Sequence, residues 1–338
     1  MCYIVFRYEK TNLNNWARIN RLSLDYIETR FHGGQSMNKF SGVLSPVLTP
    51  FTKDLTPDSK RLVKQCRWLL SQNVSLAVFG TTSEANSLAL EEKISLLYDL
   101  IEAGIDPAFL MPGTGCCSLT ETVQLTTHAV QLGCQGTLML PPFYYTDATD
   151  DGLFRSYAET IERVGDSALR IYLYDIPRFT GVNISLELIE RLVARYPSVI
   201  VGIKDSSGNW ENTQSILERQ WDDFRVFCGS ETFLLQTMRA GGSGCISATV
   251  NINPSAIHNL YQEWESNEAD DLQQQLNQVR HTVEAYPMVP ALKSVVSHYR
   301  KDPDWTIVRP PFISLEQETQ QELVQKLDKV GLKIPHLD

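Results

Sequence analysis

The sequence lacks any apolar run of the roughly 18 residues that a membrane-spanning helix needs, so it does not predict a transmembrane protein. It also lacks an excess of positive charge, because 30 Lys and Arg stand against 40 Asp and Glu, for a formal net charge of −10. An acidic chain has no general attraction to nucleic acid or to an anionic membrane surface. We therefore expect neither of these as a partner.

The seven cysteines show none of the spacings that mark a metal site. No CxxC pair is present, and no Cys/His pairs stand at the short fixed intervals of a zinc site. Several cysteines lie inside apolar runs, which is typical of buried, reduced thiols. We interpret the chain as a cytoplasmic protein without a bound metal.

Residues 1–36 differ from the rest of the chain, since Asn, Arg and Tyr are frequent and no period emerges. The apolar stretch of a signal peptide is missing. We interpret this segment as an N-terminal extension or a translation-start artefact, with a targeting or interface arm as the alternative. A more regular pattern begins at Met37.

From residue 42 onward, short apolar runs alternate with longer amphipathic stretches. The runs are near-continuously apolar, as expected for parallel strands buried on both faces. They are GVLSPVL (42–48), SLAVFG (75–80), AFLMPG (108–113), GTLMLPP (136–142), LRIYLYDIP (169–177), VIVGIKD (199–205), FRVFCG (224–229) and GCISAT (244–249). Eight strand–helix units predict an α/β fold of the (β/α)₈ barrel type. An open doubly wound sheet is the alternative, but the chain has neither GxGxxG nor a P-loop.

Helix-start signals lie between the apolar runs. Pro57 and Asp58 precede one amphipathic stretch, and Ser118 precedes another with Glu121 at capping-box spacing. After about residue 267 the strand pattern stops, and residues 267–285, 288–300 and 315–331 have helical patterns. We expect a barrel over 37–266 and a C-terminal helical region over 267–338.

Lys204 ends one of the apolar runs, in VIVGIKD. A buried ammonium is costly, and burial lowers the pKa of an amine, which frees it to attack a carbonyl. Active sites of (β/α)₈ barrels lie at the C-terminal ends of the strands. Lys204 is therefore a candidate nucleophile. The structural alternative is a lysine that is paired with Asp205.

Two further motifs end apolar runs. Tyr174, in IYLYDIP, should lie beside Lys204, where a phenol can transfer protons to and from a carbinolamine. The alternative is an ordinary core tyrosine. Thr81 and Thr82, in FGTTSE, follow a strand, and their hydroxyls with turn amides can hold a carboxylate. Threonine pairs in loops are common, so this motif alone is weak.

Taken in order, GTTSE, YDIP and GIKD resemble motifs of the dihydrodipicolinate synthase / N-acetylneuraminate lyase family of class I pyruvate-dependent aldolases. The resemblance runs from about Gly42 to Pro311 and includes VLTPF, MPGTGCCS, PPFYY, the GS pair of FCGSE, and GCISAT. It implies a (β/α)₈ barrel and a lyase that needs no cofactor.

The resemblance also implies roles for individual residues. Lys204 matches the lysine that forms a Schiff base with C2 of pyruvate, and Tyr174 matches the proton-relay tyrosine. Thr82 matches the threonine that holds the pyruvate carboxylate, and Thr81 the one that links to the tyrosines. Tyr144 matches the aromatic residue lent to a neighbouring subunit's relay, with Tyr145 as the alternative.

Ile246 matches the strand-8 residue that lines the pyruvate pocket, and Gly229 belongs to the matching GS pair. Arg178, one residue before the family's arginine position, is a further candidate substrate-binding residue. The shared tyrosine implies a homo-oligomer, a dimer or a homotetramer built from two dimers. The adjacent Cys116 and Cys117 have a conceivable redox role, but we interpret them as packing residues.

The chain departs from the family pattern at three positions. Ser83 replaces the usual glycine of GTTGE, which removes backbone freedom from that loop. Asp175 replaces the usual asparagine. In PRFTG, Phe179 stands where the synthases have an arginine directly before TG, and Arg178 is one residue earlier. This displacement argues against the synthase activity.

We therefore predict a Schiff-base-forming lyase that acts on a 2-oxo acid, with pyruvate as donor or product and an aldehyde as the second reactant. The first alternative is 4-hydroxy-tetrahydrodipicolinate synthase, which condenses pyruvate with aspartate semialdehyde. The others are a sugar-acid dehydratase that uses the same lysine and a non-catalytic 2-oxo acid sensor. Retention of Lys204, Tyr174 and the threonine pair argues against the sensor.

Overall fold

The computed structural model describes residues 39–334, so the proposed N-terminal extension over 1–36 lies outside the described part. Seven strands form one parallel sheet in the order β2-β1-β7-β6-β5-β4-β3. They are β1 (Gly42–Ser45), β2 (Ser75–Leu76), β3 (Thr137–Met139), β4 (Ile171–Asp175), β5 (Ile200–Asp205), β6 (Arg225–Cys228) and β7 (Gly244–Ile246). The sheet curls so that its two edge strands, β2 and β3, approach each other.

Residues 110–114 close the gap between these two edges. On one side the Met111 amide donates to the carbonyl of Leu76 at 2.8 Å. On the other side the Leu138 amide donates to the carbonyl of Pro112 at 2.9 Å, and the Thr114 amide donates back to Leu138 at 3.0 Å. The eight-stranded barrel is thus confirmed, and the open doubly wound sheet is excluded. The strand expected from Ala108 is present only as two isolated bridges, Leu76 with Leu110 and Gly113 with Leu138, and Pro107–Phe109 form a 3₁₀ turn.

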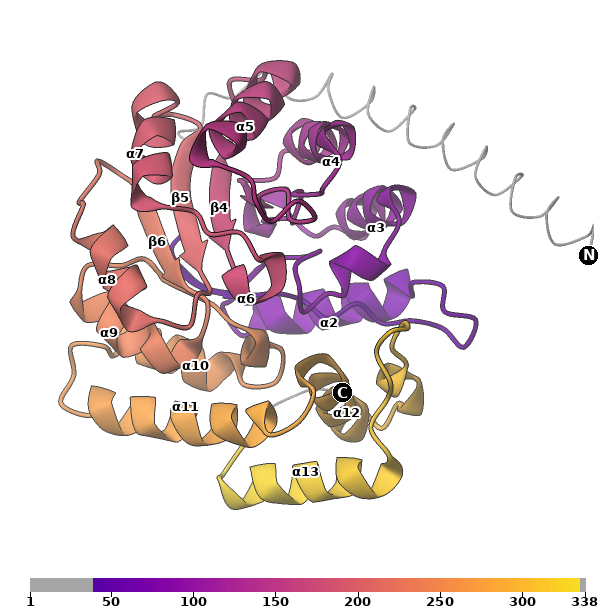
Figure 1. The fold of residues 1–338 in the computed structure, drawn as a ribbon. Coiled ribbons are helices and arrows are strands. Elements are labelled where there is room, and N and C mark those ends of the chain that lie inside the picture. The colour runs from indigo at the N-terminus through magenta and orange to yellow at the C-terminus, as the bar shows by residue number, and fades with distance from the viewer. Residues whose placement is uncertain (1–38, 335–338) are drawn as a thin grey trace, which may run out of the picture.

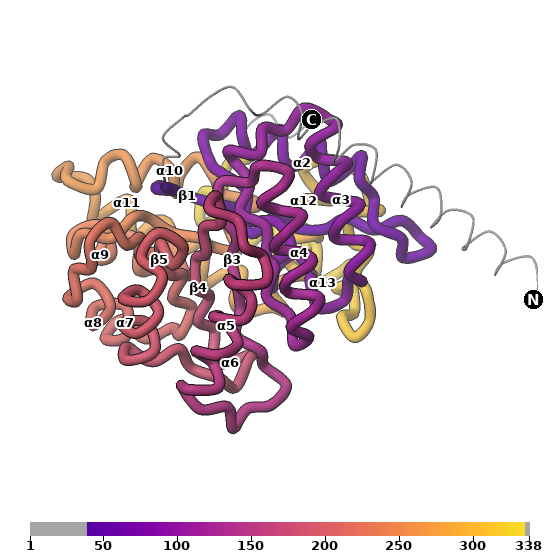
Figure 2. Tube along the Cα trace, turned by 90° about the horizontal axis from the view of Figure 1, so that it is seen from above, coloured from indigo at the N-terminus to yellow at the C-terminus, as the bar shows by residue number. Residues whose placement is uncertain are grey.

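Helices surround the strands (Figures 1 and 2). They are α2 (Ser59–Ser71), α3 (Leu90–Glu102), α4 (Leu119–Gln131), α5 (Asp150–Val164), α6 (Pro177–Thr180), α7 (Leu186–Arg195), α8 (Trp210–Leu217), α9 (Leu234–Arg239) and α10 (Pro254–Gln262). The capping signals act as expected. The Asp58 side chain accepts from the Arg61 amide, and the Ser118 hydroxyl accepts from the Glu121 amide.

Three more helices, α11 (Ala269–Glu284), α12 (Met288–Arg300) and α13 (Gln317–Lys329), lie together at one end of the barrel (Figure 1). Their bounds agree with the predicted helices to within two residues. The predicted boundary at 266/267 falls between α10 and α11, and the division into two regions stays a prediction. No helix within residues 39–334 is both long and apolar enough to cross a membrane.

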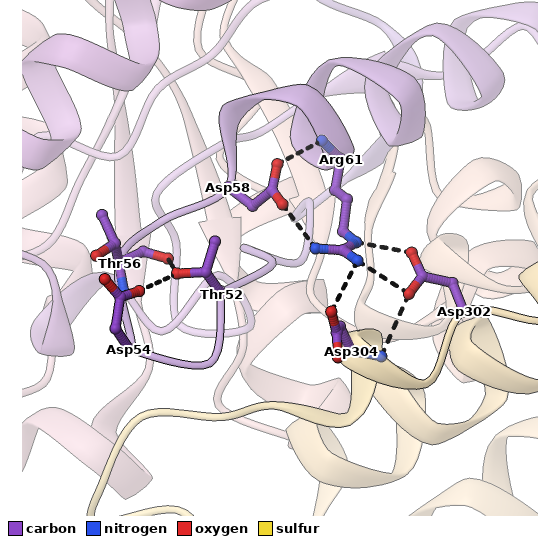
Figure 3. A network of polar contacts seen from close by, with 7 residues as sticks. All are labelled: Thr52, Asp54, Thr56, Asp58, Arg61, Asp302 and Asp304. Carbon is purple, nitrogen blue, oxygen red and sulfur yellow. Dashed lines mark hydrogen bonds and ion pairs between the residues drawn. The ribbon is translucent and has the colours of Figure 1, made fainter.

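An arginine joins α2 to the segment that follows α12 (Figure 3). The Arg61 guanidinium lies 2.7 Å from a carboxylate oxygen of Asp58, 2.7 Å from Asp302 and 3.1 Å from Asp304. These side chains are partly exposed, so water weakens each pair, but three carboxylates converge on one cation. The contacts hold the C-terminal helices in place against the barrel.

Side chains fill the barrel interior. Tyr172 and Phe227 are fully buried there, and their ring centroids lie 6.0 Å apart. The neighbouring Gly202 has no room for a side chain, because a β-carbon would lie 2.7 Å from the Tyr172 ring. The interior is therefore a packed core, and polar chemistry is confined to the strand ends.

Candidate active site

Tyr174 and Lys204 occupy matching positions near the C-terminal ends of adjacent strands. They are register partners on β4 and β5, and the Lys204 Nζ lies 4.1 Å from the centroid of the Tyr174 ring. Both side chains are buried. The predicted position of Tyr174 beside Lys204 is thus observed.

Lys204 has no ion-pair partner among the described residues. Asp205, the partner of the structural alternative, accepts instead from the Ser207 amide at 2.8 Å and from the Thr213 hydroxyl at 2.5 Å. Adjacent strand residues point to opposite faces, so the Lys204 and Asp205 side chains diverge. The alternative of a Lys204–Asp205 pair is therefore wrong, and the amine is free to meet a ligand.

The loop after β2 brings a hydroxyl to the tyrosine. The Thr81 Oγ1 lies 3.1 Å from the Tyr174 Oη. Ser83 supports this loop, because its hydroxyl accepts from the Gly80 amide at 3.1 Å and its carbonyl accepts from the Thr49 hydroxyl at 2.8 Å. The left-handed residues flanking this turn are Phe79 and Glu84, not Ser83. Glycine's freedom is therefore not needed at position 83.

A buried ion pair anchors the end of the same loop. The Glu84 carboxylate pairs with the Lys293 ammonium of α12, and both side chains are fully buried. Glu84 also accepts from the Arg309 amide at 3.0 Å, and Lys293 donates to the Ile307 carbonyl at 2.8 Å. Burial lowers the pKa of Lys293 to about 8, although Glu84 opposes this shift.

Beside these residues lies a cavity of about 580 Å³, which is large enough for pyruvate together with a second small molecule. Six residues predicted from the sequence line it: Thr81, Thr82, Tyr174, Arg178, Lys204 and Gly229. A side chain at Gly229 would collide with Ser206 and lie 2.8 Å from the Asp205 carbonyl oxygen, so only glycine fits there.

Two predicted residues lie elsewhere. Ile246 is fully buried in the interior cluster that also contains Tyr174, and it is not among the residues that line the cavity. Tyr144 is 77% exposed and stacks edge-to-face on the neighbouring Tyr145, 74% exposed, away from the cavity of its own chain. Their expected roles in pyruvate binding and in a neighbour's relay stay predictions.

Arg178 and Phe179 both line the cavity. The Arg178 guanidinium lies 4.6 Å from the centroid of the Phe179 ring, and both side chains are exposed. Arg178 is thus within reach of a ligand, but its guanidinium is stacked on a ring and lies in contact with solvent.

Asp175, the second departure from the family pattern, is buried directly after Tyr174. Its carboxylate accepts from the Ile184 amide at 3.1 Å. Burial, reinforced by the charge of Asp205, raises the pKa of Asp175 to about 7.

Several lining residues were missed by reasoning from the sequence. Four are hydroxyl side chains on the loops after β5 and β6, and two are charged residues of α11: Ser206, Ser207, Ser230, Thr232, Arg280 and Glu284. The serines stand just past the strand ends, where barrel ligands bind, so this position could have indicated them. No local signal indicated Arg280 or Glu284, which have the pattern of a solvent-facing helix.

Lys204 lies at the strand ends of a closed (β/α)₈ barrel, beside a cavity and the paired hydroxyls of Thr81 and Tyr174. This arrangement is that of a barrel enzyme. Comparison with known proteins identifies the family. Residues 39–330 match the model of the dihydrodipicolinate synthetase family. The chain is 34% identical, over 86% of its length and 99% of the relative's, to a 4-hydroxy-tetrahydrodipicolinate synthase of Methanococcoides burtonii. It is 30% identical, over 82% of its length and 92% of the relative's, to an uncharacterized DapA-like lyase of Chloroflexus aurantiacus.

A solved structure supports the same family. The prophage protein YagE of Escherichia coli K12, a member of the dihydrodipicolinic acid synthase family solved in complex with pyruvate, superposes with a TM-score of 0.79. Its identity to this chain is 26%, over 87% of this chain and 99% of YagE. The chain therefore belongs to the dihydrodipicolinate synthetase family, and it is a lyase or aldolase of that family. The family and enzyme class predicted from the motifs are confirmed.

Proposed function

We propose that Lys204 forms a Schiff base with pyruvate and that the protein makes or breaks a carbon–carbon bond next to it. One observation carries the proposal: among the described residues, Lys204 is the only lysine that lines the 580 Å³ cavity. YagE, a structural relative, binds pyruvate. Lys293, which is fully buried, is paired with Glu84 and does not line this cavity.

The chemistry begins with the Lys204 amine attacking C2 of pyruvate. A C–N bond forms, and the carbonyl oxygen takes up protons and leaves as water, which yields the iminium. Tyr174, next to the amine, supplies and removes these protons, and Thr81 holds the Tyr174 hydroxyl at 3.1 Å. Thr82 is proposed to bind the pyruvate carboxylate, and its buried position at the cavity wall supports this role.

The iminium acts as an electron sink. A proton lost from C3 of the pyruvate moiety gives an enamine, which attacks the aldehyde carbon and forms the new C–C bond. In the reverse direction the same iminium accepts the electron pair of the C–C bond that breaks. Every protein group that acts in these reaction steps is a side chain that lines the cavity. The reaction as proposed therefore uses no metal or organic cofactor.

The active unit is proposed to be a homo-oligomer, a dimer or a tetramer of two dimers, in which Tyr144 or Tyr145 serves a neighbouring subunit. Two large amphipathic rings exposed side by side support an interface at this loop. A cytoplasmic location is also proposed, and six free thiols within residues 39–334 support a reducing compartment.

The test is incubation with pyruvate and borohydride, followed by intact mass and peptide mapping. We expect one reduced adduct, located on Lys204, and none in Lys204→Ala. An adduct on Lys293, or one that persists in Lys204→Ala, would show that the assignment is wrong. Absence of any adduct in the wild type would favour the sensor alternative.

A further inference from the structure

Arg280 of α11 is held at the cavity wall by two carboxylates. Its Nη1 lies 3.3 Å from Glu231 and 3.1 Å from the Ser247 hydroxyl, and its Nε lies 2.7 Å from Glu284. Glu231 belongs to the 3₁₀ turn Glu231–Phe233 and is 1% exposed, whereas the Arg280 side chain is 10% exposed. The guanidinium is thus fixed in position by residues from three elements.

Arg280 has more N–H donors than hydrogen-bond partners among the described residues. Of its five N–H donors, three are engaged with Glu231, Ser247 and Glu284. The two on Nη2 have no partner within residues 39–334. Glu231 is fully engaged, since its second oxygen accepts from the Thr249 hydroxyl. Glu284 uses one oxygen on Arg280, and its other oxygen accepts from no described residue.

Arg280 and Glu284 both line the cavity and present complementary groups to it. Arg280 offers free donors, and Glu284 offers a free acceptor. A hydroxyl group both donates and accepts, so one hydroxyl can satisfy both. The hydroxyls of Ser230 and Thr232, 2.9 Å apart, add further groups of this kind to the same cavity.

The local charge disfavours an anion. One cation, Arg280, stands between two carboxylates, Glu231 and Glu284, so the cluster carries a net charge of one minus two, or −1. A carboxylate or phosphate here would face a net negative cluster, which water screens only in part because Glu231 is 1% exposed and Glu284 is 40% exposed. Arg178, the other arginine of the cavity, is exposed and stacked on Phe179, so water screens its charge.

We propose that Arg280 and Glu284 form a specificity subsite that binds a hydroxyl of the second reactant, and that this reactant is an uncharged, hydroxylated aldehyde. The proposal rests on the proposed function, in which Lys204 holds pyruvate. It assigns the C-terminal helix α11 a direct part in substrate selection.

The test compares glyceraldehyde with glyceraldehyde 3-phosphate and succinic semialdehyde as partners of pyruvate. These probes contrast a neutral hydroxyaldehyde with a phosphorylated and a carboxylated one. We expect kcat/KM for glyceraldehyde to exceed both others by at least about tenfold, which corresponds to about 1.4 kcal/mol. Arg280→Lys keeps a cation beside Glu231 but loses the planar set of donors, and it should lower kcat/KM for glyceraldehyde by about tenfold or more.

Glu284→Gln provides the second variant. It removes one negative charge, while Arg280 stays paired with Glu231. We expect it to shift the preference severalfold toward the phosphorylated aldehyde. Asp270→Asn is the matched control: Asp270 also lies on α11 and pairs with an arginine, Arg239, but at the exposed surface and away from the cavity. Its preference should equal that of the wild type.

Trapping with pyruvate and borohydride separates the two proposals. If the wild type forms no adduct at Lys204, the proposed function fails. If the adduct forms but the wild type prefers an anionic aldehyde, the subsite assignment is overturned while the Schiff base stands. The assignment is also overturned if Glu284→Gln leaves the preference unchanged, or if Arg280→Lys retains full activity toward glyceraldehyde.

Discussion

The Lys204 Nζ lies 4.1 Å from the centroid of the Tyr174 ring, and the two residues are register partners on parallel strands. The sheet therefore fixes their separation. Because parallel strands end at the same edge of the barrel, the amine and the phenol face one cavity without any loop having to place them. The Thr81 hydroxyl, 3.1 Å from the phenol, extends this arrangement to the next loop.

Tyr174→Phe removes only the hydroxyl and should lower turnover by roughly 10²–10⁴-fold, since a positioned proton donor is lost. Trapping of pyruvate on Lys204 should largely survive. Tyr157→Phe is the matched control, because Tyr157 is equally buried but does not line the cavity. Equal turnover in both variants would make Tyr174 a structural residue.

Condensation of pyruvate with aspartate semialdehyde should be at least about 100-fold slower than reaction with the true partner, a gap of about 2.7 kcal/mol in transition-state binding. The arginine that the resemblance assigns to the semialdehyde carboxylate is replaced by Phe179, and Arg178 is stacked on that ring. A coupled assay on the wild type and on Arg178→Ala measures this. Efficient wild-type turnover that is lost in Arg178→Ala would restore the synthase assignment.

Tyr144→Ala, with Tyr145→Ala beside it, should weaken self-association and lower turnover together. The reason is that both rings are exposed and neither lines the cavity of its own chain. Sedimentation at the assay concentration, combined with activity measurements, provides the readout. A wild-type monomer with full activity is incompatible with a shared relay.

Asp175→Asn should change how stability depends on pH. In the folded protein the pKa of Asp175 is raised to about 7 by burial and by Asp205. The carboxyl group therefore stabilises the fold fully below its unfolded value near pH 4, and this contribution is lost as the pH rises through about 7.

Asparagine carries no charge and can still accept from the Ile184 amide. Relative to the wild type, Asp175→Asn should thus gain stability between pH 5 and pH 8, by an amount on the order of a few kcal/mol. Thermal melts of both proteins across this range measure the gain. Parallel pH profiles would refute the raised pKa.

Lys293→Met should destabilise the fold by about 3–5 kcal/mol, because it leaves the Glu84 carboxylate buried without a counter-ion. Lys326→Met is the comparison, since its pair with Glu322 is exposed and should matter little. Urea unfolding of the two variants distinguishes them. Similar midpoints would show that the buried pair contributes no more than the exposed one.

The sequence by itself determined the barrel, and it indicated the two residues at the centre of the candidate site. Buried parallel strands have near-continuous apolar runs, and helix caps have local signatures at Asp58 and Ser118, so the strand–helix rhythm was visible without coordinates. Lys204 was identifiable because a charge at the end of an apolar strand is costly unless it has a use.

Only the tertiary structure decided the rest of the cavity. Arg280 and Glu284 lie on an amphipathic helix, and nothing local distinguishes a charge that faces water from one that faces a cavity formed by remote segments. Two further contacts form only when remote segments meet. Glu84 pairs with Lys293 once the C-terminal helices have docked on the barrel. Asp205 accepts from the Thr213 hydroxyl once the strand and the following helix have packed together. Local patterns record which face of an element is apolar, but the partner of a charged side chain is set by the three-dimensional arrangement of the whole chain.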